Sequence, residues 1–128
     1  MTERLRRTTI NLPISGALAV AAGVVTWAAQ FRGRIEEVEL SLGTTGSTSG
    51  STTVDVKKGG ASIMAANALQ IAQGSATKYV RASPAAASGH PKGLPFEPGD
   101  VITVDVTTVP GTASTNGLVT LSIIAQDV

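Results

Sequence analysis

The chain is poor in the residue types from which catalytic and metal sites are usually built. Its 128 residues include no cysteine, so it has no disulfide, no thiolate metal site and no cysteine nucleophile. Histidine occurs once, at His90. Aromatic residues make up only 3% of the chain, so a core must be filled by Val, Ile, Leu and Ala.

Charge is scarce and nearly balanced. Charged residues make up 15% of the chain, and 10 Lys and Arg against 9 Asp and Glu give a net charge of +1. General capture of nucleic acid needs a clustered excess of basic residues, so no nucleic-acid partner is expected. The length fits one domain with its own core.

The segment from residue 34 to residue 64 has the clearest pattern. Apolar and polar residues alternate over residues 38–42 and again over residues 52–57, as in strands with one buried face. The intervening Gly-, Ser- and Thr-rich stretch contains no apolar residue and is predicted to be a loop. Lys58-Gly59-Gly60 then favours a hairpin turn.

Other short strands are predicted along the rest of the chain, at residues 8–14, from Leu18, and at 24–28, 65–73, 78–81, 101–106 and 118–125. Turns are expected at Ser15-Gly16 and at Gly23, and a helical turn over residues 66–69 is the alternative within the fourth of these segments. About eight short, regularly spaced strands predict an all-β fold, an antiparallel β-sandwich or jelly roll.

Two features of the pattern need separate interpretation. Thr53-Val54-Asp55-Val56 recurs as Thr103-Val104-Asp105-Val106, which indicates two strands in similar surroundings. The apolar run over residues 12–29 imitates a signal peptide or a membrane span. Pro13 and two glycines interrupt it, and much of it is alanine, so strands and no membrane partner are expected.

The N-terminal residues are basic. Arg4, Arg6 and Arg7 stand against Glu3, and residues 1–8 are predicted to form a short arm before a single sandwich domain of residues 9–128. The arm is either a solvated terminus or a segment that lies on an acidic neighbour.

A second candidate contact segment is the stretch over residues 82–99. Four prolines and three glycines predict a long irregular loop, and such loops often have a function. Contact with a neighbouring subunit is the function expected here. The candidate partner-contact residues of the chain are therefore Arg4, Arg6, Arg7, His90, Lys92 and Phe96.

No catalytic constellation is found in the sequence. His90 has no partner nearby, the G-x-S-x-G and P-loop patterns are missing, and adjacent glutamates at 36, 37 and 39 fit an outward strand face. Asp100, Asp105 and Asp127 are hard ligands of the kind Ca²⁺ takes, but no D-x-D-x-D loop accompanies them. We expect no enzyme, no metal and no cofactor.

The order of the motifs resembles a β-sandwich module of structural proteins in tailed bacteriophages. The segments that carry this resemblance are residues 10–16, 25–27, 37–44, 53–56, 60–63, 99–106 and 109–112. The resemblance implies a jelly-roll-like virion component without catalytic residues.

The expected function is that of a capsid decoration, or cement, protein. It would bind the major capsid protein on the outer surface of an assembled head as a homo-oligomer, with a trimer as the expected state. The alternative is a recognition module of a tail, baseplate or fibre, including a carbohydrate-binding one. A sugar platform needs at least two of Trp27, Phe31, Tyr79 and Phe96 on one surface, whereas Trp27 is expected to be a core or rim anchor.

Overall fold

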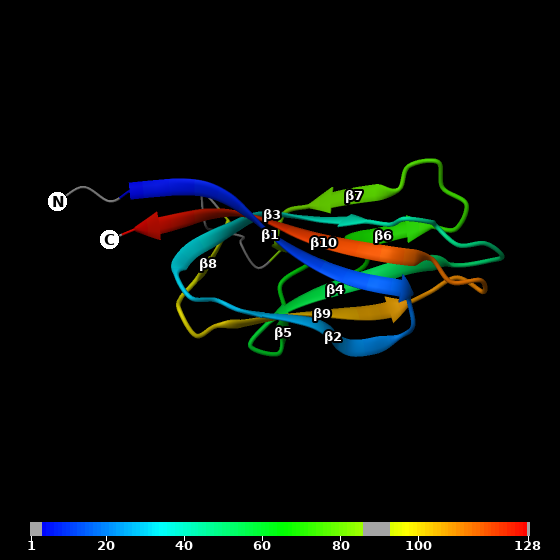
Figure 1. Ribbon diagram of the computed structural model, residues 1–128, viewed down its shortest axis with the longest axis horizontal. Coiled ribbons are helices and arrows are strands. Elements are labelled where there is room, and N and C mark those ends of the chain that lie inside the picture. Colours follow the sequence, from blue (N-terminus) through cyan, green and yellow to red (C-terminus); the bar gives the residue numbers. More distant parts are fainter. Residues whose placement is uncertain (1–3, 86–92, 128) are drawn as a thin grey trace.

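The structure is a computed structural model that describes residues 4–85 and 93–127. Within these ranges it contains strands and no α-helix (Figure 1), and so no helix long and apolar enough to cross a membrane. The strands are β1 (Arg4–Ala17), β2 (Ala21–Ala28), β3 (Arg32–Ser41), β4 (Ser51–Lys58), β5 (Ala61–Ser62), β6 (Leu69–Ala72), β7 (Tyr79–Ala82), β8 (Leu94–Phe96), β9 (Val101–Thr108) and β10 (Thr115–Asp127).

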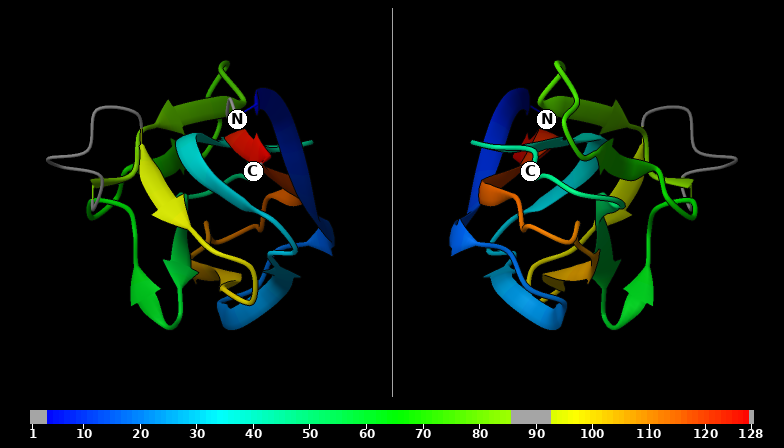
Figure 2. Two further views of the ribbon diagram at one scale, coloured as in Figure 1. Left: turned by 90° about the vertical axis from the view of Figure 1, so that its left-hand side faces the viewer. Right: turned by 90° about the vertical axis from the view of Figure 1, so that its right-hand side faces the viewer.

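The strands form two antiparallel sheets of five strands each. Sheet A has the order β1-β10-β3-β7, with β8 also paired to β3. Sheet B has the order β2-β9-β4-β5, with β6 also paired to β4. The sheets lie face to face, as the end-on views show (Figure 2).

The ten strands occupy eight strand positions. β7 and β8 pair with different halves of β3, and β5 and β6 pair with different halves of β4, so each couple is one interrupted strand. The first strand then pairs with the last, the second with β9, the third with β7 and β8, and the fourth with β5 and β6. This nested order is that of a jelly roll, which confirms the fold expected from the sequence.

Strand β1 differs from the sequence prediction at both ends. It begins at Arg4 instead of Thr8, and Arg4 pairs with Asp127. The turn expected at Ser15-Gly16 is wrong, because β1 continues to Ala17 through a bulge in which Gly16 has φ 74°. The reason is long-range: β10 offers a partner along almost the whole of β1.

Two other boundaries also differ. Gly23 was expected to separate two strands but lies inside β2, where the pairing with β9 shifts register. The segment over residues 82–99 is not irregular throughout, since β8 lies within it. Pro95 fits there because β8 is at the edge of sheet A and pairs on one side only, with β3.

The core is aliphatic, as the composition requires. The alternating apolar residues of β3, β4, β9 and β10 point between the sheets, and their large side chains are almost completely buried; among them are Ile35, Leu40, Val56, Ile102, Leu121 and Ile123. Thr52 and Ser114 are also buried, and their hydroxyl groups are hydrogen-bonded to each other at 2.7 Å. The pair satisfies two polar groups that would be costly to bury alone.

Three of the four aromatic rings pack against one another. The centroid of Trp27 lies 5.8 Å from that of Phe31 and 5.6 Å from that of Phe96, and the Phe31 and Phe96 centroids are 5.7 Å apart. Phe96 is 1% exposed, whereas Trp27 and Phe31 are partly buried. Trp27 is thus the rim anchor expected from the sequence.

Candidate partner-contact surface

The described residues contain no group of three or more His, Cys, Asp or Glu side chains that could hold a metal ion. Asp105, one of the aspartates considered as a Ca²⁺ ligand, is instead bound to a lysine and a backbone N–H. The features that stand out are therefore on the surface: a basic strand edge and a depression on the opposite edge of the sandwich.

The basic edge, defined as residues 4–9 of β1, lies at the border of sheet A. β1 pairs only with β10, so its other side is open. The side chain of Arg7 is 74% exposed, and its Nη1 atom lies 2.5 Å from Oε1 of Glu36. Arg6 is also exposed. The expected arm is thus part of the sheet from Arg4 onward, and its arginines are held in a fixed register.

Arg34 extends the basic edge across sheet A. Arg7 and Arg34 are both in register with Ile124 of β10, from its two sides. Ile124 follows the core residue Ile123 and therefore points to the outer face of sheet A, yet it is only 6% exposed. The aliphatic stems of the flanking arginines can cover such a residue. The Nε atom of Arg34 is buried without a hydrogen-bond partner.

Two depressions flank β1 at Arg7 and Thr8. One, of about 240 Å³, is lined by Arg6, Phe31 and Ala125 among others. The other, of about 400 Å³, includes Glu36 and other residues of the neighbouring strands. The basic edge therefore has a depression on each side, and such a shape suits a contact with another protein.

Three predicted contact residues remain. His90 and Lys92 lie outside the described residues. Phe96 is described, but at 1% exposure its ring belongs to the aromatic cluster and is out of reach of a partner. Its contact role was expected because the sequence placed it in an irregular loop, whereas it lies in β8 and points inward.

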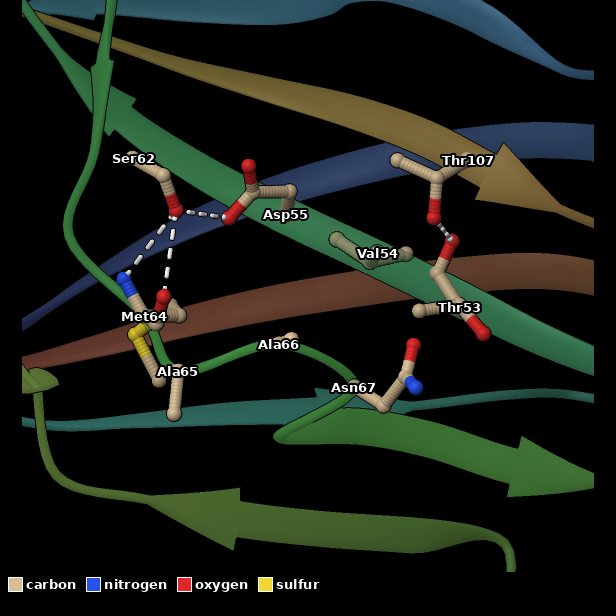
Figure 3. Close-up of a pocket in the computed structure, with 9 residues that line it drawn as sticks. All are labelled: Thr53, Val54, Asp55, Ser62, Met64, Ala65, Ala66, Asn67 and Thr107. Atoms are coloured by element: carbon tan, nitrogen blue, oxygen red, sulfur yellow. Dashed lines mark hydrogen bonds between the residues drawn. The ribbon is translucent and has the colours of Figure 1, made fainter.

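The second feature, which we call the notch, lies where β5 gives way to β6 (Figure 3). It is a depression of about 400 Å³ lined by Thr53, Val54, Asp55, Ser62, Met64, Ala65, Ala66, Asn67 and Thr107. The interruption of the strand position creates it, because residues 63–68 leave the edge of β4 before β6 resumes the pairing. Asn67 has φ 59°, which lets the chain turn there.

The repeated Thr-Val-Asp-Val segments meet at this place. β4 and β9 are neighbours, and Asp55 is paired directly with Asp105. The expectation of similar surroundings holds for the strands but not for the two carboxylates. Asp105 is 11% exposed, lies 2.8 Å from Nζ of Lys57 and accepts a hydrogen bond from the N–H of Gly23. Asp55 accepts one from the Ser62 hydroxyl, at 2.6 Å.

The surroundings of Asp105 lower its pKa. The hydrogen bond from Lys57 is the main cause, followed by that from the Gly23 N–H, and together they outweigh the opposing effect of burial. A carboxyl group with a lowered pKa in the folded state stabilises the fold above its ordinary pKa of 3.8, and this contribution is lost as the pH falls through the folded value.

Acid unfolding should report this interaction. We expect Asp105→Asn, which keeps an acceptor for Gly23 but loses the charge, to be less stable than the original chain at pH 7 by about 1 to 3 kcal/mol. The difference should shrink below about pH 4. Urea unfolding at a series of pH values measures it. Lys57→Met should move the acid loss of stability to higher pH, and an unchanged profile in both variants would contradict the assignment.

Tyr79 is the one aromatic side chain that is largely exposed, at 52%, and the Arg81 guanidinium lies 5.5 Å from the centre of its ring. The other three rings pack against one another in tilted or edge-to-face contacts, away from Tyr79. The carbohydrate-binding role stays a prediction, for which the neighbouring and partly buried rings of Trp27 and Phe31 are the available pair.

The notch was not predicted from the sequence. The repeated Thr-Val-Asp-Val segment was the available signal, since it marked two aspartates in similar strands, but their direct pairing depends on the topology. The basic edge was predicted because its arginines are close together in sequence.

Comparison of the sequence with protein-family models and with curated proteins gives no match. The fold matches solved structures. A chain in the capsid of Ralstonia phage GP4 is 20% identical, with a TM-score of 0.50 over 99% of this chain and 86% of that chain. A chain of the cyanophage Pam1 capsid asymmetric unit is 13% identical, with a TM-score of 0.47 over 95% of this chain and 85% of that chain. At the identity of the GP4 chain, the likeness shows a shared fold.

Proposed function

We propose that this chain is a structural protein of a phage head, a decoration protein that binds the outer surface of the assembled shell and stabilises it. The observation that carries the proposal is the fold match to a chain in the GP4 capsid, which extends over 99% of this chain. The motif order in the sequence supports the same class of protein independently of the fold comparison.

The mechanism of stabilisation is mass action. A protein that binds the assembled shell and not the free subunits shifts the equilibrium toward the shell. A homo-oligomer, with a trimer as the proposed state, would bind neighbouring capsid subunits through several contacts at once. Each contact then reinforces the others through effective concentration.

The proposed contact with the major capsid protein or with a neighbouring copy includes the basic edge. Arg4, Arg6 and Arg7 belong to one strand at the edge of sheet A, and half of the ten basic residues of the chain lie in β1 and at the start of β3. His90 and Lys92 stay in the proposal as untested members. An acidic partner surface is the complement of such an edge.

Binding to heads tests the proposal. Purified chain is added to phage heads that lack it, bound copies are counted on gels, and their positions are determined by electron cryo-microscopy. We expect saturable binding at symmetry-related sites on the outside of the shell and a higher temperature of head disruption. Exclusive binding to tails or baseplates, or no binding to heads, would overturn the proposal.

The contribution of the basic edge to head binding is best tested by substituting its residues and not by deleting them. Residues 4–7 pair with β10, so their removal would take away part of a strand as well as the charges. Arg7→Glu reverses the charge of a 74% exposed side chain and should weaken head binding about tenfold. Lys78→Glu, at another exposed position, is the matched control and should bind normally.

A further inference from the structure

The notch combines an apolar wall with a small set of oxygen acceptors. Met64, Ala65 and Ala66 contribute the apolar part. Asp55, Asn67 and Thr107 line the same depression, and Figure 3 shows Asp55 and Thr107 on two neighbouring strands and Asn67 on the connection between β5 and β6. This combination suits a long side chain with an aliphatic stem and a cationic head, that is, arginine or lysine.

Asp55 has the charge that such a head needs. The facing carboxylate of Asp105 is already bound by Lys57 and Gly23. Asp55 accepts a hydrogen bond from Ser62 but forms no ion pair with any residue in the described part of the chain. A cation in the notch would pair with Asp55 and offset its repulsion with Asp105 across the two strands.

We propose that the notch binds an arginine side chain from the basic edge of a second copy of this chain. The two features lie at opposite edges of the sandwich: the basic edge is on β1, which ends sheet A, and the notch is beside β5 and β6, which end sheet B on the other side. Arg7, at 74% exposure, is the arginine best placed to leave its surface pair with Glu36.

The geometry makes the contact heterologous, because the surface that each copy offers differs from the surface that it receives. Such contacts form a closed ring when the rotation between copies closes, as in a trimer. No single copy can satisfy the contact within itself. The inference rests on the proposed homo-oligomer and names the contact that would hold it together.

Charge reversal tests the contact. Sedimentation of the free protein over a range of concentrations measures self-association. Asp55→Arg and Arg7→Glu should each weaken it about tenfold or more, and the combined variant, in which the charges are exchanged, should recover most of it. Asp55→Asn keeps a hydrogen-bond acceptor for Ser62, so it should fold normally and still associate more weakly.

Matched controls change charge elsewhere. Glu37→Arg and Lys78→Glu alter the net charge as the test variants do and should leave self-association unchanged. A wild-type chain that remains monomeric at every concentration, or a combined variant that associates no better than the single ones, would overturn the inference.

Head binding, measured separately, distinguishes this inference from the proposed function. If Asp55→Asn self-associates normally but no longer binds heads, the notch receives a basic group of the shell and the self-contact is overturned. If the chain self-associates through the notch and does not bind heads, the inference stands and the proposed function fails.

Discussion

Replacing Phe96 by alanine is expected to lower the free energy of unfolding by about 3 to 5 kcal/mol, the usual cost of removing a buried phenylalanine ring. Phe96 is 1% exposed and is the innermost of three rings in a protein with few aromatic residues. Removing the ring leaves a cavity beside the rings of Trp27 and Phe31. The neighbouring aliphatic side chains are too small to fill it. Urea unfolding followed by circular dichroism measures the change.

The fluorescence of Trp27, the single tryptophan, gives a local readout for the same variant. Its ring packs edge-on against Phe96, so Phe96→Ala should shift its emission to longer wavelength before unfolding. Tyr79→Ala is the control: it removes an aromatic ring that is 52% exposed and should change stability by less than about 0.5 kcal/mol. Equal effects of the two substitutions would show that Phe96 is not a core residue.

Phe96 also shows why part of the fold could not be predicted from the sequence. The four prolines and three glycines of residues 82–99 predict an irregular loop, and in such a loop its ring would be exposed. The structure places it in β8, a three-residue strand whose only partner is β3. A strand that short has no visible alternation, so only the long-range pairing reveals it.

The strands that were predicted well are those with strict alternation between clear turn signals. β4 (Ser51–Lys58) and β9 (Val101–Thr108) lie within two residues of their predicted bounds. Alternation marks one face of a strand as apolar, and this pattern is visible in the local sequence without knowledge of the partner strand. β1 was predicted less well because its first residues are basic and its pairing with β10 joins segments from opposite ends of the chain.

Of the two candidate surface features, the basic edge was predicted from the sequence and the notch was not. Arginines that are near in sequence were recognised as a group, and the structure holds them along one edge. The notch joins residues of β4, the β5–β6 connection and β9, and nothing in the sequence indicated that strand β4 would have an interrupted neighbour. A site whose residues come from several strands can be predicted only when the order of the strands in the sheet is known.

The connections at the end of the sandwich away from the chain termini are themselves held together closely. The Ser47 and Thr112 backbones exchange two hydrogen bonds, each 3.0 Å long, and join the β3–β4 loop to the β9–β10 loop. Gly46 lies beside them with φ 79°, and a Cβ atom there would be 2.5 Å from the carbonyl oxygen of Thr112. The position thus combines a left-handed backbone with a close approach.

Gly46→Ala is therefore expected to lower the free energy of unfolding by about 3 kcal/mol or more, as the sum of backbone strain and overpacking. Two other alanine substitutions separate the causes. Gly59 has φ 59° in open space, so Gly59→Ala should cost about 1 kcal/mol from the backbone alone. At Gly33 a Cβ would lie 2.6 Å from the Ile124 carbonyl oxygen, so Gly33→Ala should cost about 1 to 3 kcal/mol from crowding. If Gly46→Ala costs no more than Gly59→Ala in urea unfolding, the two loops separate easily, and this end of the sandwich is not the rigid platform that the paired backbones indicate.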